Sequence, residues 1–111
     1  MSSPSEVAQA QLDAYNAQDL DAHCARFADD VVVAELNGPV TLEGIGAYRE
    51  RYAKLFADFP DNRAELLGRV AVGDVVMDHE RVWRTKTAAP FEAVAIYTIR
   101  GGMIRRVDFV R

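Results

Sequence analysis

The stretch from residue 63 to residue 110 reads RAELLGRVAVGDVVMDHERVWRTKTAAPFEAVAIYTIRGGMIRRVDFV, and it decides the fold. Branched and aromatic side chains, which are typical of β-strands, dominate four extended runs. These runs are Arg63–Val72, Val75–Lys86, Phe91–Arg100 and Met103–Val110. Turn-forming residues separate them at Gly73-Asp74, Ala88-Ala89-Pro90 and Gly101-Gly102. Because parallel strands need a long crossover, the two-residue connections predict antiparallel hairpins.

Two helices are predicted at the start of the chain. Ser3-Pro4-Ser5-Glu6 is a capping box with proline at the first helical position, and the helix should end near residues 16–18. Asp19 is expected to cap a second, short helix whose apolar stripe continues to Phe27. The acidic pair Asp29-Asp30 should end that helix.

Two short strands and a third helix connect these helices to the strand-rich half. The runs Val31–Leu36 and Val40–Leu42 are predicted strands, and the turn Asn37-Gly38-Pro39 joins them. A helix should begin around Ile45 and end before Pro60, which cannot continue it. The element order predicts an α+β fold with an antiparallel sheet and helices on one face.

Size, charge and cysteine content limit the classes of function. The 111 residues fit one domain, residues 1–111. The net charge of −4 disfavours binding to a phosphate backbone, so no nucleic-acid partner is expected. No run of eighteen apolar residues is present, so we expect no membrane partner either. The single cysteine, Cys24, gives no disulfide, and without a visible signal peptide the expected location is cytoplasmic.

Four short motifs resemble the nuclear transport factor 2-like superfamily, which includes ketosteroid isomerases and SnoaL-like polyketide cyclases. They are Tyr15–Asp21 between the first two helices, Phe27–Val31, Leu42–Gly44 before the third helix, and Gly101–Ile104 before the last strand. The resemblance covers nearly the whole chain. It implies a cystatin-like roll, in which a curved antiparallel sheet wraps around three helices and forms a cone with one pocket.

The resemblance also suggests roles for individual residues. The general base of the isomerases, a carboxylate at the end of the first strand, matches Glu35 here. Their oxyanion-binding tyrosine falls on Gln11, and the protonated aspartate that assists it falls on Ala95. A supporting tyrosine of the third helix is retained as Tyr52. With both oxyanion donors missing, an ordinary steroid isomerase is not expected.

Strand alternation, laid on this resemblance, assigns side chains to the two faces of the sheet. In the run from Val75, we expect the face with Met77, His79, Arg81 and Trp83 to line the pocket. In the next run the expected pocket face carries Ala93, Ala95, Tyr97 and Ile99. The opposite, outer face would carry Val76, Val82, Val94 and Ile96. Because superfamily members pair through that face, a homodimer is expected.

The expected pocket is apolar and aromatic with a few polar groups, which is the usual make-up of a small-molecule site. Glu35 and His79 are the predicted catalytic residues, because a desolvated carboxylate becomes a competent base and an imidazole can polarise a carbonyl. The predicted ligand-contacting residues are Tyr15, Tyr52, Phe56, Arg81, Trp83 and Tyr97. His23 and Cys24 are expected in the core. The orientations of Arg105 and Asp108 stay open.

No metal or other cofactor is expected, because two histidines and one cysteine do not supply three or four convergent ligands. The first functional hypothesis is an isomerase or cyclase that transfers protons on a small apolar or aromatic molecule. The alternative is a non-catalytic domain that holds a ligand or serves as a dimeric scaffold. A fold of this kind hosts many chemistries, so the pocket residues must decide between them.

Overall fold

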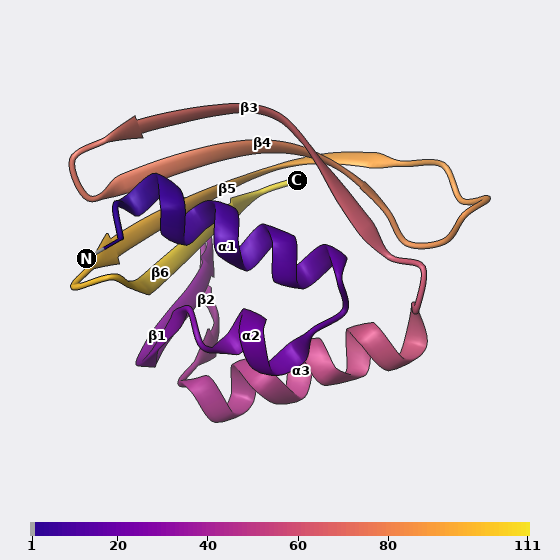
Figure 1. The fold of residues 1–111 in the computed structure, drawn as a ribbon, viewed down its shortest axis with the longest axis horizontal. Coiled ribbons are helices and arrows are strands. Elements are labelled where there is room, and N and C mark those ends of the chain that lie inside the picture. The colour runs from indigo at the N-terminus through magenta and orange to yellow at the C-terminus, as the bar shows by residue number, and fades with distance from the viewer. Residues whose placement is uncertain (1) are drawn as a thin grey trace.

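The computed structural model describes residues 2–111 and places three helices against one six-stranded sheet. Along the chain the elements are α1 (Pro4–Asn16), α2 (Leu20–Cys24), β1 (Phe27–Glu35), β2 (Val40–Glu43), α3 (Ile45–Asp58), β3 (Arg63–Val72), β4 (Val75–Trp83), β5 (Phe91–Arg100) and β6 (Met103–Val110). The strand order in the sheet is β2-β1-β6-β5-β4-β3. Figure 1 shows the long strands curving over α1, with α3 at the bottom of the view, on the side of α1 away from β3 and β4. The predicted α+β fold is confirmed.

One pair of neighbouring strands departs from the predicted antiparallel arrangement. β1 runs parallel to β6, with Val33 opposite Val107 and Glu35 opposite Phe109. All other neighbouring pairs among the described residues are antiparallel. β1 and β6 are far apart in the chain, so no tight turn sets their relative direction. Because parallel strands end on the same side, the end of β1 lies beside the end of β6.

The helix caps follow the sequence, but the second helix is shorter than predicted. Ser3 Oγ accepts from the Glu6 backbone N–H, and the Glu6 carboxylate accepts from the Ser3 N–H. The Asp19 side chain caps α2 by accepting from the backbone of Ala22. The expectation that this helix continues past Phe27 was wrong, because β1 begins there and Phe27 pairs with Ile104 of β6. Phe27 is buried in the strand, as it would have been in a helix, so its apolar spacing could not distinguish the two.

The assignment of faces on β4 was also wrong. Val76, Asp78, Glu80 and Val82 point inward, and Met77, His79, Arg81 and Trp83 point outward. In the observed register Val76 lies opposite Tyr97, whereas the prediction put Met77 and Tyr97 on one face. A slip of one residue turns every side chain of a strand to the other face. Both faces of β4 carry apolar ends and charged centres, so hydropathy could not reveal the slip.

The main core lies between α1 and the concave face of the sheet. The face predicted for β5 is confirmed, since Ala93, Ala95, Tyr97 and Ile99 are all buried. Val7 and Ala8 of α1 pack in the same cluster as Ala95, Tyr97 and Ile99, and Cys24 is buried there as predicted. Tyr48, Tyr97 and Val107 of this core also line a cavity, which is the candidate site.

Candidate functional site

A cavity of about 70 Å³ lies between the inner face of the sheet and helices α1 and α3. That volume is about half of the ~150 Å³ of an engineered cavity that holds benzene. Only a small molecule would fit this volume unless the wall moves. Aromatic rings form much of the lining, together with five side chains that are polar or charged: Gln11, His23, Glu80, Arg84 and Arg111. A small, mostly aromatic cavity with few polar groups has the composition of a ligand site.

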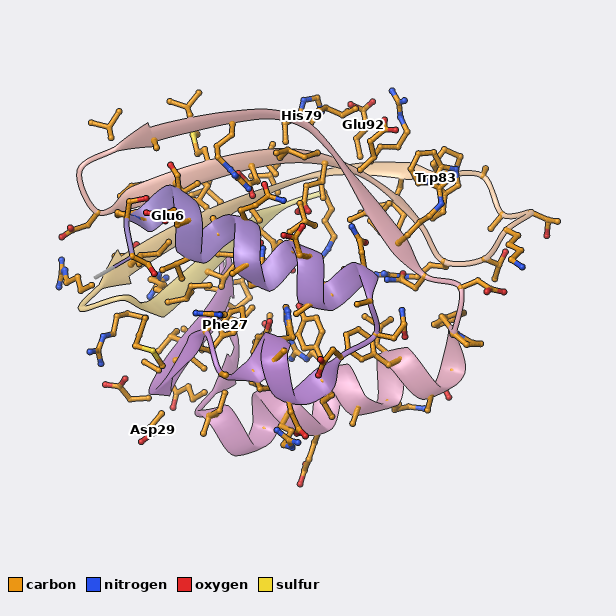
Figure 2. The ribbon with its side chains drawn as sticks, in the orientation of Figure 1. Glu6, Phe27, Asp29, His79, Trp83 and Glu92 are labelled. Atoms are coloured by element: carbon orange, nitrogen blue, oxygen red, sulfur yellow. The ribbon has the colours of Figure 1, made fainter. Side chains whose placement is uncertain are left out.

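Three of the six predicted ligand-contacting residues line this cavity: Tyr15, Tyr52 and Tyr97. Phe56 is buried behind them, with its ring centroid 5.6 Å from that of Tyr15. Arg81 and Trp83 point away from the cavity because of the reversed face of β4. Figure 2 shows Trp83, His79 and Glu92 on the outer side of the sheet, away from the helices.

The two predicted catalytic residues are not brought together. Glu35 lies at the end of β1, where its carboxylate accepts from Arg111 Nη1 at 2.8 Å with 40% of its side chain exposed. His79 lies on the outer face of β4, where its Nε2 is 2.6 Å from Glu92 Oε1 and 48% of its side chain is exposed. The expectation that His79 faces the pocket was wrong. A shared site for Glu35 and His79 does not form.

Glu80 is the carboxylate of the cavity, and it lies on the β4 face of Val76 and Val82, which strand alternation was expected to turn outward. Only 8% of the residue is exposed, and it contributes to the cavity wall. Within residues 2–111 no hydrogen-bond donor or cation pairs with its side chain. The pKa of Glu80 is raised from 4.5 to about 7, chiefly by burial and in smaller part by the charge of Asp78, while Arg69 opposes the rise. This carboxyl can therefore hold or release a proton near neutral pH.

Asp78 explains why Glu80 has no cationic partner. Asp78 is fully buried, and its two carboxylate oxygens accept from Arg69 Nε and Nη2 at 2.7 and 3.0 Å. Arg69 Nη1 donates to Gln9 of α1 at 3.0 Å. Such a two-bond contact fixes the guanidinium plane against one carboxylate. Arg69 thus neutralises Asp78 and leaves the charge of Glu80 uncompensated.

Tyr97 presents a free hydroxyl donor in the same cavity. Gln11 Nε2 donates to the Tyr97 oxygen at 3.0 Å, and both side chains are buried. The phenolic proton itself has no acceptor among residues 2–111. Burial raises the pKa of Tyr97 far above its usual range, and the charges of Glu80 and Asp78 add to this effect. The hydroxyl therefore stays protonated and can donate to a ligand oxygen.

His23 is buried, as predicted, and forms one wall of the cavity. Its Nδ1 lies 2.9 Å from the backbone oxygen of Gln11 and its Nε2 lies 2.8 Å from the Tyr48 hydroxyl. A carbonyl oxygen can only accept, so Nδ1 carries the proton and Nε2 accepts from Tyr48. Burial lowers the pKa of His23 to about 4. This histidine is neutral at pH 7, and its Nδ1–H holds the backbone carbonyl of Gln11 in place.

Comparison with known proteins shows the family. The model of the SnoaL-like domain matches residues 8–107. The chain belongs to the SnoaL-like domain family. This family lies in the nuclear transport factor 2-like superfamily, so the resemblance inferred from the four motifs is confirmed. The comparison with curated proteins found no match.

Solved structures resemble this SnoaL-like domain over almost all of its length. An uncharacterised cystatin-fold protein from Novosphingobium aromaticivorans is 37% identical over 100% of both chains, with a TM-score of 0.91. A protein from Sinorhizobium meliloti described as a putative polyketide cyclase is 25% identical, with 95% of this chain and 94% of that chain covered and a TM-score of 0.80. A putative ketosteroid isomerase from Kribbella flavida is 16% identical over 96% of this chain and 75% of that one, with a TM-score of 0.80, which shows the fold alone.

The polar groups of this SnoaL-like domain differ from those that the isomerases use. Ala95 is fully buried and brings no donor where the resemblance predicts an aspartate. On α1, Gln11 stands where the isomerases have a tyrosine. Its side chain donates a hydrogen bond to the hydroxyl of Tyr97, so the phenol beside position 11 comes from β5 and not from α1. Nothing in the sequence marked Tyr97 as the partner of Gln11, because the two are 86 residues apart.

Two further observations describe the chain as a whole. Among residues 2–111, no three histidine, cysteine, aspartate or glutamate side chains gather in a way that could hold a metal ion. Within the same residues, none of the helices has the length and apolar character needed to span a membrane.

Proposed function

We propose that this SnoaL-like domain is a proton-transfer enzyme of the isomerase or cyclase type that acts on a small apolar or aromatic carbonyl compound. Glu80 would be its acid/base and Tyr97 its hydrogen-bond donor. The observation that carries the proposal is a nearly buried carboxyl on the wall of an aromatic cavity, without a partner and with its pKa raised to about 7. Catalytic acids and bases work best when their pKa lies near the working pH.

The proposed reaction starts with the ionised form of Glu80. Its carboxylate takes a proton from a carbon next to the substrate carbonyl, and the electron pair moves to the carbonyl oxygen. Tyr97 donates a hydrogen bond to the negative charge that develops on that oxygen, as in an oxyanion hole. The protonated Glu80 then returns the proton to another carbon, which gives isomerisation. Alternatively, the enolate carbon attacks a second carbonyl of the same molecule, and the protonated Glu80 gives its proton to the alkoxide oxygen that forms, which gives cyclisation.

Two features favour Glu80 over Glu35 and His79, the residues predicted from the sequence, as the acid/base of this reaction. Glu35 is paired with Arg111 and His79 with Glu92, and both are substantially exposed, so water competes at both sites. Glu80 and Tyr97 both line one cavity and are both buried, and electrostatic interactions at buried groups are stronger than in water. The relative described as a putative polyketide cyclase agrees with the cyclase option.

The second candidate function is a non-catalytic ligand-binding domain. The cavity of about 70 Å³ favours it, because reacting groups and a substrate must share a small space. The absence of the superfamily aspartate at Ala95 favours it as well. In that case Glu80 and Tyr97 would only orient a bound molecule.

Exchange of carbon-bound protons with solvent separates the two functions. Small ketones and aromatic ketones are incubated in D₂O with the protein, and loss of the α-proton signal is followed by NMR. The proposal predicts catalysed exchange in the wild type and its loss in Glu80→Gln. The matched variants Glu35→Gln and His79→Gln should retain exchange. Exchange that survives Glu80→Gln but disappears in Glu35→Gln would contradict the assignment of Glu80.

We also propose that the domain forms a homodimer through the outer face of the sheet. Val76 and Val82 cannot take part, because both are buried in the core. The β3–β4 hairpin instead exposes an apolar group, with Val70 at 62% and Val72 at 73% exposed next to Met77. Exposed apolar side chains that are contiguous often mark an interface.

A further inference from the structure

We propose that Arg84, together with the Tyr15 hydroxyl, binds the carboxylate of the substrate, so that the substrate is a small apolar or aromatic monocarboxylate. This inference rests on the proposed function, since it names the substrate class of the same cavity. Arg84 follows the end of β4 and reaches the cavity wall on the same face as Glu80.

The surroundings of Arg84 hold its guanidinium in place without neutralising it. Its Nη1 donates to Asn62 Oδ1 at 2.7 Å and to the Tyr15 hydroxyl oxygen at 3.2 Å. The guanidinium carbon lies 5.0 Å from the ring centroid of Phe91. All three partners are uncharged. Within the described residues 2–111, Arg84 forms no ion pair with a carboxylate.

The Tyr15 hydroxyl adds a second donor at the same place. Its oxygen accepts from Asn62 Nδ2 at 2.6 Å and from Arg84 at 3.2 Å, which uses both of its lone pairs. Its own proton has no acceptor in the part of the chain that the structure describes. Asn62 is itself buried, and its backbone oxygen accepts from Gln18. The groups left free around Arg84 are therefore donors, which suit an anion.

The other positive charges at the cavity are already paired, and Glu80 is the one unpaired carboxyl on its described wall. Arg111 also lines the cavity but bonds to Glu35 at 2.8 Å, and Arg69 behind the wall bonds to Asp78 at 2.7 Å. Arg84 is thus the one guanidinium on the described cavity wall that lacks an anionic partner. The single unpaired positive charge of Arg84 would be balanced by one carboxylate group on the substrate. A guanidinium with free N–H groups also fits a carboxylate through two parallel hydrogen bonds.

The position of Arg84 relative to Glu80 limits the shape of the substrate. Glu80 lies in β4 and Arg84 is the first residue after it, so at ~3.3 Å per residue their Cα atoms are at most roughly 13 Å apart. Val82 lies between them and Phe91 beside them, and both line the cavity. A carboxylate at Arg84 would leave an apolar or aromatic body over Val82 and the reacting carbon toward Glu80.

Calorimetric titration compares three carboxylates with their neutral amides: benzoate, phenylacetate and 3-phenylpropionate against benzamide, phenylacetamide and 3-phenylpropionamide. The wild type should bind at least one carboxylate roughly tenfold or more tightly than its amide, because a charged hydrogen bond is lost in the amide. Arg84→Gln should remove that preference, and Tyr15→Phe should weaken it. Arg63→Gln is the matched control, since this guanidinium stacks on Trp83 outside the cavity and should change nothing.

The preference for the acid is measured on the unaltered protein, so it does not depend on whether a variant folds. Equal binding of acid and amide, or no binding of any carboxylate at millimolar concentration, would overturn the inference. A preference that persists in folded Arg84→Gln would overturn it as well. Glu80→Gln should still prefer the acid, so this result is separate from proton exchange. Exchange of neutral ketones without any preference for carboxylates would leave the proposed function standing and remove only this inference.

Discussion

Replacing Glu80 by glutamine should stabilise the protein at alkaline pH and leave it almost unchanged at acidic pH. The pKa of Glu80 rises from 4.5 to about 7 on folding, chiefly through burial. The folded state therefore favours the protonated form. The stability linked to this carboxyl is fully present below pH 4.5, is lost as the pH rises, and is gone above about pH 7. Glutamine has nearly the same shape and cannot ionise, so it avoids that loss.

The size of the effect follows from the shift. A difference of about 2.5 pKa units, at about 1.4 kcal/mol each, amounts to about 3 kcal/mol at pH 8. At pH 5 most of the carboxyl is still protonated in the folded state, and the difference should fall below about 1 kcal/mol. With a urea m-value of ~1.5 kcal/mol/M, the midpoint of Glu80→Gln should lie about 2 M above that of the wild type at pH 8.

Urea unfolding at pH 5 and pH 8, followed by circular dichroism, tests this prediction. Glu65→Gln is the control, because Glu65 is on the neighbouring strand with 49% of its side chain exposed. Its free energy of unfolding should change by less than about 0.5 kcal/mol at both pH values. If Glu80→Gln shifted the midpoint equally at pH 5 and pH 8, or lowered it at pH 8, the buried and unpaired state of Glu80 would be refuted.

Three further predictions concern the groups around Glu80 and the outer face. Asp78→Ala should lower the free energy of unfolding by about 3 kcal/mol, measured by urea unfolding, because it leaves Arg69 largely buried without its anion. Tyr97→Phe should slow α-proton exchange by roughly 100-fold while thermal unfolding shows an intact fold, because only the hydrogen bond to the oxyanion is lost; an unchanged rate would remove Tyr97 from the mechanism. Light scattering should give a dimer for the wild type and a monomer for Val72→Asp, since the exposed hairpin would then carry a charge; a wild-type monomer at micromolar concentration would exclude this interface.

Local chemistry made much of the fold predictable. β3, β5 and β6 have the predicted bounds, and glycine turns set the end of β3, the end of β5 and the start of β6: Gly73, Gly101 and Gly102 all adopt positive φ angles. The starts of α1 and α2 were predictable because the capping side chains of Ser3 and Asp19 bond to backbone groups only three residues away. These features depend on neighbours in the sequence, and single-sequence reasoning can use them.

Non-local pairing was not predictable in the same way. Which face of β4 points inward depends on its register with β5. The loop of seven residues that connects them, Arg84 to Pro90, is too long to fix that register as a tight turn would. Because the wrong face of β4 was predicted to point inward, His79 was expected in the cavity and Glu80 was not. The ion pair of Glu35 depends on the parallel pairing of β1 with β6, which places Arg111 beside it. Two acidic residues between valines on one face, at Asp78 and Glu80, were the available signal of a polar group in the core.

An NMR titration of the glutamate side-chain carboxyl carbons would show whether Glu80 is a cavity carboxyl that titrates near neutral pH. The chain contains seven glutamates. One resonance should titrate near pH 7, the value to which burial raises the pKa of Glu80, and it should be missing from the spectrum of Glu80→Gln. If all seven resonances titrated near the ordinary value of 4.5, Glu80 would be ionised throughout the neutral range and the proposed acid/base role would be contradicted.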